Sequence, residues 1–198
     1  MSLVAAEQTG SNNVLRLASE VGSKLQQLNL SYCWIGGVAY QRWGEPRQTV
    51  DIDGTVFAGY GQEREFAEKL SQLYTPRIDD FLTFAVVNRI VLLESDAGLG
   101  IDLSLGGLPF EERMMERASD WEVAEHGTIR TCSAEDLVVL KAFASRPQDW
   151  IDVEKVIIRQ GERLNRQQIL QELQPLVDLK EEPEIITHLT QLFDGEIV

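Results

Sequence analysis

Residues 32–57 decide the fold of this chain, and they read YCWIGGVAYQRWGEPRQTVDIDGTVF. A short apolar run leads into Gly36 and Gly37, and a later run carries Asp51 and Asp53. Successive side chains along a strand point to opposite faces, so the two carboxylates share one face. We therefore expect an apolar strand, a glycine turn, a short helix, and a second strand that presents a pair of acids.

The paired acids and the glycine turn together predict a site for a metal ion and a phosphate. Two carboxylates side by side repel each other unless a cation lies between them. Mg²⁺ takes oxygen ligands and commonly binds one or two carboxylates together with substrate phosphates. Glycines at the start of a helix leave backbone N–H groups open to a phosphate. The first hypothesis is therefore a metal-dependent site that handles a nucleotide.

A third carboxylate follows on another predicted strand. Residues 100–105 read GIDLSL, in which Asp102 and Ser104 alternate with apolar side chains. This alternation predicts a strand with one polar and one buried face. The other elements expected in this half are helices over 13–28 (capped by Ser11, Asn12 or Asn13), 38–43, 63–73 and 80–87, a strand over 89–93, a short helix from Pro109, and short strands over 121–123 and 128–131.

The composition becomes helical from Ser133 onward. Ser133 suits an N-cap, and Pro147 suits the start of the following helix. Four helices are expected in this half, over 134–145, 148–159, 166–176 and 184–193. The predicted fold is an α/β (α+β) domain over residues 1–132, with a small mixed sheet flanked by helices, followed by a helical domain over residues 133–198 packed on it.

Charge and cysteine content restrict the classes of function. The formal net charge of −14 argues against broad, non-specific attraction to nucleic acid or to anionic membranes. No apolar stretch approaches the length needed to span a membrane. The two cysteines, Cys33 and Cys132, lack the spacing of a metal or redox motif, and Cys33 lies in an apolar run. We expect a buried thiol there and a protein of the reducing cytoplasm.

The motifs of the first half resemble the polymerase-beta-like nucleotidyltransferase superfamily. Within it, they are similar to the AbiEii-like toxins and related minimal nucleotidyltransferases, whose first motif is Gly-Gly, a short helix, and then Arg-x-Thr-x-Asp-x-Asp. Here Gly36-Gly37 precede the run RQTVDID over residues 47–53. Asp102 takes the place of the third carboxylate on a neighbouring strand.

The helical half carries a second set of matching residues. The family pattern of a Glu, a Lys, an Arg and Asp-x-x-Asp corresponds here to Glu135, Lys141, Arg146, Asp149 and Asp152. The resemblance spans roughly residues 32 to 155, and the last helices add nothing to it.

The resemblance implies an Mg²⁺- or Mn²⁺-dependent enzyme that transfers an NMP group from an NTP to a hydroxyl of an RNA, a protein or a small molecule. It implies metal binding by Asp51, Asp53 and Asp102, and a catalytic part for Lys141 and Asp149. It further implies an antitoxin protein as partner. The nucleotide would be bound by five residues: Gly36, Gly37, Arg47, Thr49 and Lys141.

Several of these residues could instead have a purely structural role. Gly36-Gly37 could serve turn geometry alone, and Lys141 and Asp149 could form an ordinary ion pair between helices. Arg47 could brace the carboxylates without touching a substrate. Arg42, Arg77 and Arg89 are interpreted as surface or structural residues.

Two other functions compete with nucleotidyl transfer. The run DIDGTV over residues 51–56 also matches the opening motif of haloacid-dehalogenase-like phosphatases, in which Asp51 would be the nucleophile and Asp53 the acid or base. The residues before it make a poor buried parallel strand, which disfavours this hypothesis. The second alternative is a nucleotidyltransferase fold kept as a non-catalytic binding module for a partner.

Overall fold

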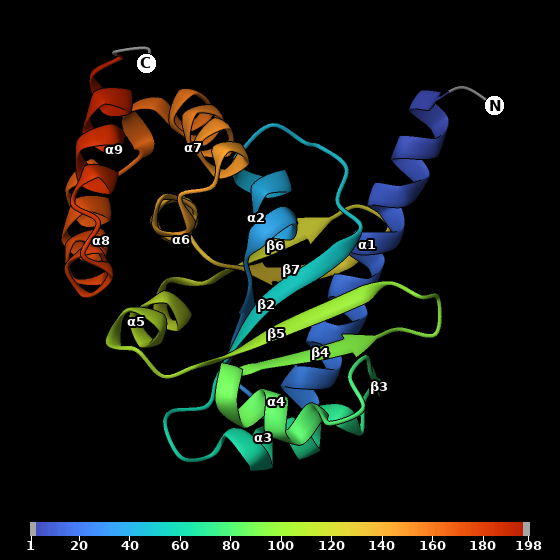
Figure 1. Ribbon diagram of the computed structural model, residues 1–198. Coiled ribbons are helices and arrows are strands. Elements are labelled where there is room, and N and C mark those ends of the chain that lie inside the picture. The colour runs from blue at the N-terminus through green and yellow to red at the C-terminus, as the bar shows by residue number, and fades with distance from the viewer. Residues whose placement is uncertain (1–2, 196–198) are drawn as a thin grey trace. The chain divides into compact units, whose positions relative to one another are not determined.

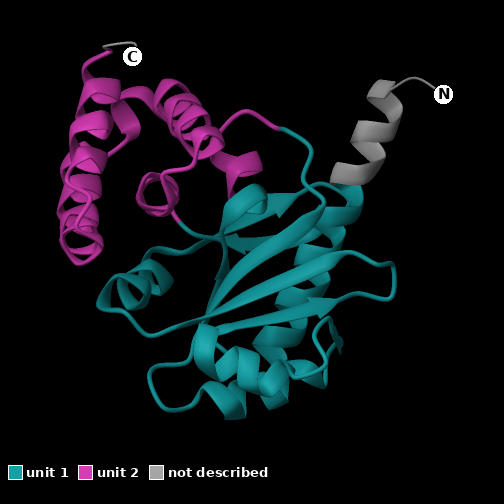
Figure 2. Cartoon of the chain, in the orientation of Figure 1, with its two compact units in different colours: residues 1–38, 47–132 teal, residues 39–46, 133–198 magenta. Residues whose placement is uncertain are grey.

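The structure of the protein, a computed structural model, describes residues 3–195 (Figure 1). It divides into two compact units, one formed by residues 1–38 and 47–132 and the other by residues 39–46 and 133–198 (Figure 2). The elements of the first unit are α1 (Leu3–Gln27), β1 (Tyr32–Trp34), the start of α2 (Gly36–Trp43), β2 (Asp51–Phe57), α3 (Glu63–Ser71), β3 (Thr75–Pro76), α4 (Phe81–Asn88), β4 (Ile90–Glu94), β5 (Gly100–Gly106), α5 (Pro109–Arg117), β6 (Ser119–Val123) and β7 (Gly127–Thr131).

The first unit is built on a seven-stranded mixed sheet with the order β3-β4-β5-β2-β1-β7-β6. β2 runs parallel to β5 and β1 runs parallel to β7, while the other neighbours are antiparallel. β2 and β5 therefore lie side by side near the middle of the sheet, although 42 residues separate their ends along the chain (57 to 100). This parallel pair brings together the two segments that carry the predicted carboxylates.

One face of the sheet is buried against α1 (Figure 1). Ile52 and Val56 of β2 join Ile101 and Leu103 of β5 in the same hydrophobic core as the buried side chains of α1. Burial of these aliphatic side chains stabilises the unit through the hydrophobic effect. Because side chains alternate along a strand, the acids at 51, 53 and 102 are directed to the opposite face.

The second unit is helical. It contains α6 (Ala134–Ala144), α7 (Pro147–Gln160), the 3-10 turn η1 (Gly161–Arg163), α8 (Arg166–Lys180) and α9 (Glu184–Asp194). Residues 39–46 join it through hydrogen bonds from the end of α7. The Gln160 amide donates to the Trp43 carbonyl at 2.7 Å, and the Arg159 guanidinium donates to the Gly44 carbonyl. The boundary between the units therefore falls inside α2.

The predicted fold class, a mixed α/β sheet with flanking helices followed by a helical region, is confirmed. Ser133 caps α6 as expected, since its hydroxyl accepts from the Asp136 backbone N–H at 3.1 Å. Both cysteines are buried. Within residues 3–195, no helix is both long and apolar enough to cross a membrane.

Three details of the sequence prediction were wrong. The first helix begins at Leu3, so Asn12 and Asn13 lie inside it and do not cap it, because local propensity is a weak constraint that a longer helix overrides. α8 continues past Pro175 to Lys180, where burial of Leu176 and Val177 outweighs one lost backbone hydrogen bond. The two-residue β3 was missed because it is too short to carry a periodic pattern.

Candidate functional site

Asp51, Asp53 and Asp102 lie on the neighbouring parallel strands β2 and β5. Asp53 is paired directly with Asp102 across the strands, and Asp51 is paired with Gly100. Paired residues of adjacent strands project to the same face, so the two strands direct all three carboxylates to the face that does not pack on α1. All three side chains are half-buried. The register of β2 on β5 thus brings together three acids that are up to 51 positions apart in the sequence (51 to 102).

Two glycines at the start of α2 lie directly against residues of this site, one against a carboxylate and one against Thr49. Gly36 has a φ of +49°, and a Cβ placed on it would collide with the Asp53 carboxylate. A Cβ on Gly37 would collide with the Thr49 side chain, 2.8 Å from its Cβ. The backbone at the beginning of α2 can therefore approach the acids only because these positions lack side chains.

Thr49 positions Asp51. Its side chain is buried, and its hydroxyl donates to the Asp51 carboxylate oxygen Oδ1 at 3.2 Å. The same hydroxyl lies 3.3 Å from the Asp51 backbone oxygen. Thr49 was predicted to bind nucleotide. Its hydrogen bonds instead orient a carboxylate, and any contact with a nucleotide stays a prediction.

Arg77 forms an ion pair with Asp102 in the structure. From the sequence alone, Arg77 is interpreted as a surface or structural residue. Burial raises the pKa of Asp102, the guanidinium of Arg77 opposes that rise, and the nearby negative charge of Asp51 adds to it. The net pKa of Asp102 lies above its usual range. The carboxylates of Asp51 and Asp102 are therefore close enough to influence each other.

The donor set suits a hard divalent cation. Carboxylate oxygens are the ligands that Mg²⁺ and Mn²⁺ prefer, and Asp51 and Asp53 present them from one face of β2. Among the side chains that the structure describes, those of residues 12–195, however, no group of three or more His, Cys, Asp or Glu is arranged to hold a metal ion by itself. A metal at this site would thus need oxygens from a bound substrate, or a change at the Arg77–Asp102 pair, to complete its ligand shell.

Lys141 and Asp149, the other predicted catalytic residues, belong to the helical unit. Lys141 Nζ donates to Asp149 Oδ1 at 3.2 Å and to Asp152 Oδ2 at 2.6 Å. The side chains of all three are at most 8% exposed. Arg146 Nε donates to Asp149 Oδ2 at 2.5 Å, and the Gln148 amide donates to Asp152 Oδ1 at 3.0 Å. Lys141, Asp149 and Asp152 form one buried charged network between α6 and α7, and the exposed Arg146 side chain pairs with it at the surface.

Opposing effects act on the carboxyl group of Asp149. Burial raises its pKa, but hydrogen bonds from Arg146 and the charge and hydrogen bond of Lys141 outweigh burial. The pKa of Asp149 therefore lies below its usual value, and the group is held ionised. The ion pair between helices that the sequence offered as an alternative is present, with Asp152 as an additional member.

Arg47 is exposed, and its guanidinium donates to the Gln48 carbonyl at 3.4 Å. Its predicted contact with a nucleotide stays a prediction. The residue that sequence reasoning missed is Arg77, which follows the two-residue strand β3. Only the register of β3 on β4 carries it toward Asp102, and no sequence motif signals that register.

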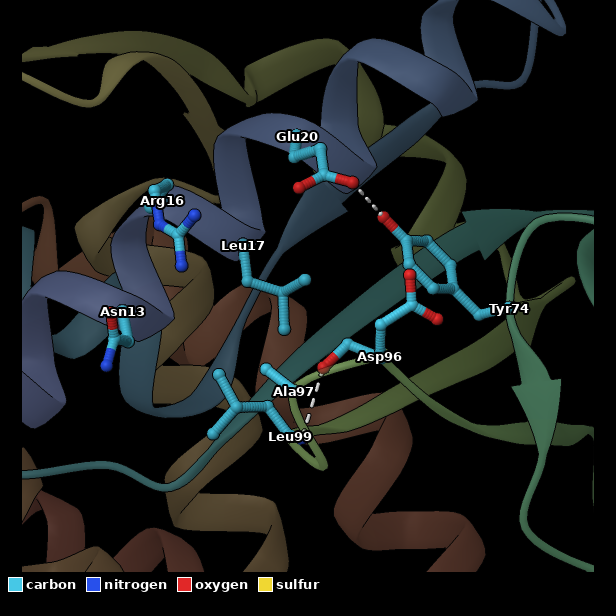
Figure 3. A pocket seen from close by; sticks show the side chains of 9 residues that line it. Asn13, Arg16, Leu17, Glu20, Tyr74, Asp96, Ala97 and Leu99 are labelled. Carbon is cyan, nitrogen blue, oxygen red and sulfur yellow. Dashed lines mark hydrogen bonds between the residues drawn. The ribbon is translucent and has the colours of Figure 1, made fainter.

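A separate pocket lies between α1 and the turn that joins β4 to β5 (Figure 3). Its volume is about 160 Å³, smaller than the 300–1,000 Å³ typical of ligand pockets. Two of the polar side chains that line it are already paired: Tyr74 donates to Glu20 at 2.8 Å, and Tyr74 also accepts from Lys24 at 2.9 Å. The pocket therefore offers less chemistry than the carboxylate face.

Comparisons with known proteins identify the fold. The sequence matches no protein-family model and no curated protein. Among solved structures, the chain is similar to an antigenic nucleotidyltransferase-like protein from Paracoccidioides brasiliensis, at 16% identity and a TM-score of 0.51 over 90% of this chain and 93% of that one. It is also similar to the antibiotic-resistance factor ANT(2'')-Ia, at 16% identity and a TM-score of 0.56 over 90% of this chain and 98% of that one. The chain has the nucleotidyltransferase fold.

Proposed function

We propose that this protein is a metal-dependent nucleotidyltransferase. It would transfer an NMP group from an NTP to an acceptor hydroxyl: a new bond forms between that oxygen and the α-phosphorus, the bond from the α-phosphorus to the bridging oxygen breaks, and pyrophosphate and a proton leave. The observation that carries the proposal is the placement of Asp51, Asp53 and Asp102 on one face of β2 and β5. The similarity of the fold to that of nucleotidyltransferases supports it.

The residues present fit the metal that the proposal needs. Asp51, Asp53 and Asp102 would hold Mg²⁺ or Mn²⁺, and the Thr49 hydroxyl keeps one oxygen of Asp51 oriented. When bound, such ions activate an acceptor hydroxyl and stabilise the negative charge that develops on the phosphates.

The start of α2 would bind the phosphates of the nucleotide. Backbone N–H groups at a helix N-terminus attract anions, and Gly36 and Gly37 leave them accessible beside Asp53. Arg47, Lys141 and Asp149 keep the roles implied by the family resemblance as proposals. Arg47 and Lys141 would contact nucleotide phosphate, and Asp149 would act with Lys141, to which it is hydrogen-bonded.

A label-transfer assay tests the reaction. The protein is incubated with each α-³²P-labelled NTP, Mg²⁺ or Mn²⁺, and in turn total RNA, total protein or a small-molecule extract. We expect metal-dependent transfer to one acceptor class, lost by at least about 10²-fold in Asp51→Asn and Asp53→Asn, since each removes a metal ligand. Asp178→Asn, an exposed acid on α8, is the matched control. Transfer that survives both active-site variants would overturn the proposal.

The AbiEii-like resemblance adds a biological role to the proposal. The protein would act in the cytoplasm as the toxin of a toxin–antitoxin pair, with an antitoxin protein as its partner. Its buried thiols are compatible with a reducing compartment. Growth arrest on expression, relieved in Asp51→Asn, is the expected outcome. Unimpaired growth in cells that contain active enzyme would count against the toxin role.

The alternatives make different predictions in the same experiments. A haloacid-dehalogenase-like phosphatase would release phosphate from phosphomonoesters through a covalent intermediate on Asp51. The start of β2 at Asp51 disfavours it, because the motif of these phosphatases should follow a buried strand and no strand residue directly precedes Asp51. A non-catalytic module would bind a partner and turn over no NTP. The alternation of acids on β2 and β5 favours the enzyme over the module.

A further inference from the structure

Arg77 is in register with Asp102 and Asp53 across four neighbouring strands, and together these residues form one row. Its backbone N–H donates to the Leu92 carbonyl at 2.9 Å, which extends the antiparallel pairing of β3 with β4 by one residue. Leu92 is paired with Asp102, and Asp102 is paired with Asp53. Residues of one row project to the same face of a sheet. The fold therefore directs Arg77 to the carboxylate face, two strands away from Asp102.

The long side chain of Arg77 crosses β4 and ends among the acids. Its Nη2 pairs with Asp102 Oδ1. Its Nη1 lies over Gly100, where an added Cβ would be 3.3 Å from that nitrogen and 3.4 Å from the Asp51 Cβ. Gly100 thus leaves the space that the guanidinium occupies beside Asp51. The Arg77 and Asp102 side chains are 34% and 25% exposed, so the pair is shielded but accessible from solvent.

A guanidinium and a divalent metal ion compete for the same carboxylate. Arginine keeps its charge at all accessible pH values, so it repels a metal ion held close to Asp102. It also binds one of the two oxygens that Asp102 can offer. Among the described side chains, those of residues 12–195, no three carboxylates, imidazoles or thiols are grouped to hold a metal.

We propose that Arg77 is a positioning residue that neutralises Asp102 in the nucleotide-free protein and opposes metal binding there. This inference rests on the proposed function, because it takes Asp102 as a metal ligand. Metal binding then requires Arg77 to leave Asp102. An incoming triphosphate favours that exchange, because guanidinium groups pair with phosphate as readily as with carboxylate. Nucleotide and metal therefore bind cooperatively, and the metal alone binds weakly.

The test measures Mn²⁺ binding to the nucleotide-free protein by the EPR signal of free Mn²⁺. We expect Arg77→Met to lower the Kd for Mn²⁺ about tenfold, a typical coupling between two ligands of one site. Arg64→Met is the matched control: Arg64 is an exposed arginine on α3 of the same unit, and its loss changes the net charge equally. Arg77→Lys keeps the charge and is expected to stay near the wild-type Kd.

Three further measurements make the outcome decisive. Asp102→Asn is expected to abolish the effect of Arg77→Met on Mn²⁺ affinity, which identifies Asp102 as the contested ligand. In the active enzyme, Arg77→Met should lower the Mg²⁺ concentration for half-maximal rate. Circular dichroism confirms that each variant is folded, and Arg77→Gln replaces Arg77→Met if the latter is not.

An unchanged or weaker Mn²⁺ affinity in folded Arg77→Met, or in the Arg77→Gln variant that replaces it, overturns the inference. The absence of measurable Mn²⁺ binding in every variant overturns it too. An equal gain in Arg64→Met also overturns it, because a general charge effect would then account for the result. The proposed function fails separately, through absence of label transfer by the wild type. A gain in Mn²⁺ affinity without any label transfer would keep the role of Arg77 and remove nucleotidyl transfer.

Discussion

At the residue scale, the geometry of the site depends on Gly36 and Asp102. Gly36 has a positive φ and lies against Asp53, so both its backbone conformation and the lack of space favour glycine. Burial raises the pKa of Asp102 most, the opposite charge of Arg77 lowers it, and the like charge of Asp51 raises it. Both positions can therefore be probed by single substitutions whose effects on stability and on activity differ.

Gly36→Ala is expected to reduce nucleotidyl transfer about 10²-fold, because its Cβ displaces the Asp53 carboxylate and small misplacements of reacting groups are costly. Gly98→Ala is the matched control. Gly98 has a φ of +75° and nothing within 4 Å of an added Cβ, so it carries the backbone strain, about 1–2 kcal/mol, without the collision. The measurements are label transfer and thermal unfolding. Equal activity in the two variants would show that the collision has no effect on the reaction.

Asp102→Asn is expected to keep or raise the melting temperature at pH 7 while it abolishes activity. The pKa of Asp102 is raised in the folded protein by burial first, so its ionised form destabilises the fold once the pH exceeds the unfolded value of about 4. The advantage of the amide should disappear as the pH falls below about 3, where the wild-type carboxyl group is neutral too. Melting curves at both pH values check this, and a large loss of stability at pH 7 would contradict it.

At the scale of elements, the Lys141 network holds α6 and α7 together. Lys141 and Asp152 are buried on facing helices, and Asp149 joins them to Arg146. Buried charges are tolerated only when they are paired and hydrogen-bonded. The helices of this unit thus depend on charge pairing in addition to their apolar core.

Asp149→Asn is expected to lower the free energy of unfolding by about 2 kcal/mol at pH 7, the usual range for a hydrogen bond to a charged partner. The pKa of Asp149 is depressed, so its contribution is present above the unfolded pKa of about 4 and is lost as the pH falls through the lower folded value. The difference from wild type should therefore shrink toward pH 2. Urea unfolding at pH 7 and at low pH measures it, with the exposed Asp178→Asn as control. A pH-independent difference would count against the pairing.

At the scale of the whole molecule, the residues with proposed roles are divided between the two units. The carboxylates and the glycines at the start of α2 belong to the first unit, whereas the Lys141 network belongs to the second.

The net charge of the chain is a second reason to expect a metal requirement, because a chain of charge −14 repels a free triphosphate. The metal is thus expected to be required for nucleotide binding.

A non-hydrolysable NTP with Mn²⁺ is expected to raise the melting temperature by roughly 5–10 °C at 100 times its Kd, from about 2.7 kcal/mol of linkage in a chain of this length. The NTP alone should give little shift, and Asp53→Asn should abolish the shift with Mn²⁺. Differential scanning calorimetry measures it. A full shift with NTP in the absence of metal would argue against metal-dependent binding.

The local elements and the acidic residues could be predicted from the sequence. The alternation of residues 51–53 and 100–105 predicted one strand with two acids on one face and a second strand with one acid, and both strands are present. The glycine pair predicted the strand-to-helix turn, and Ser133 predicted the start of α6. These features are local, because strand alternation, turn glycines and helix caps act within a few residues of the chain.

Which side chains come into contact depends on the tertiary structure. The parallel register of β2 on β5 pairs Asp53 with Asp102, and the row through β3 and β4 directs Arg77 to that carboxylate. Contact of Gly36 with Asp53, and the addition of Asp152 to the Lys141 network, also depend on packing between separate elements. Pairing register and side-chain reach across strands are properties of several segments at once. No single stretch of this sequence contains them.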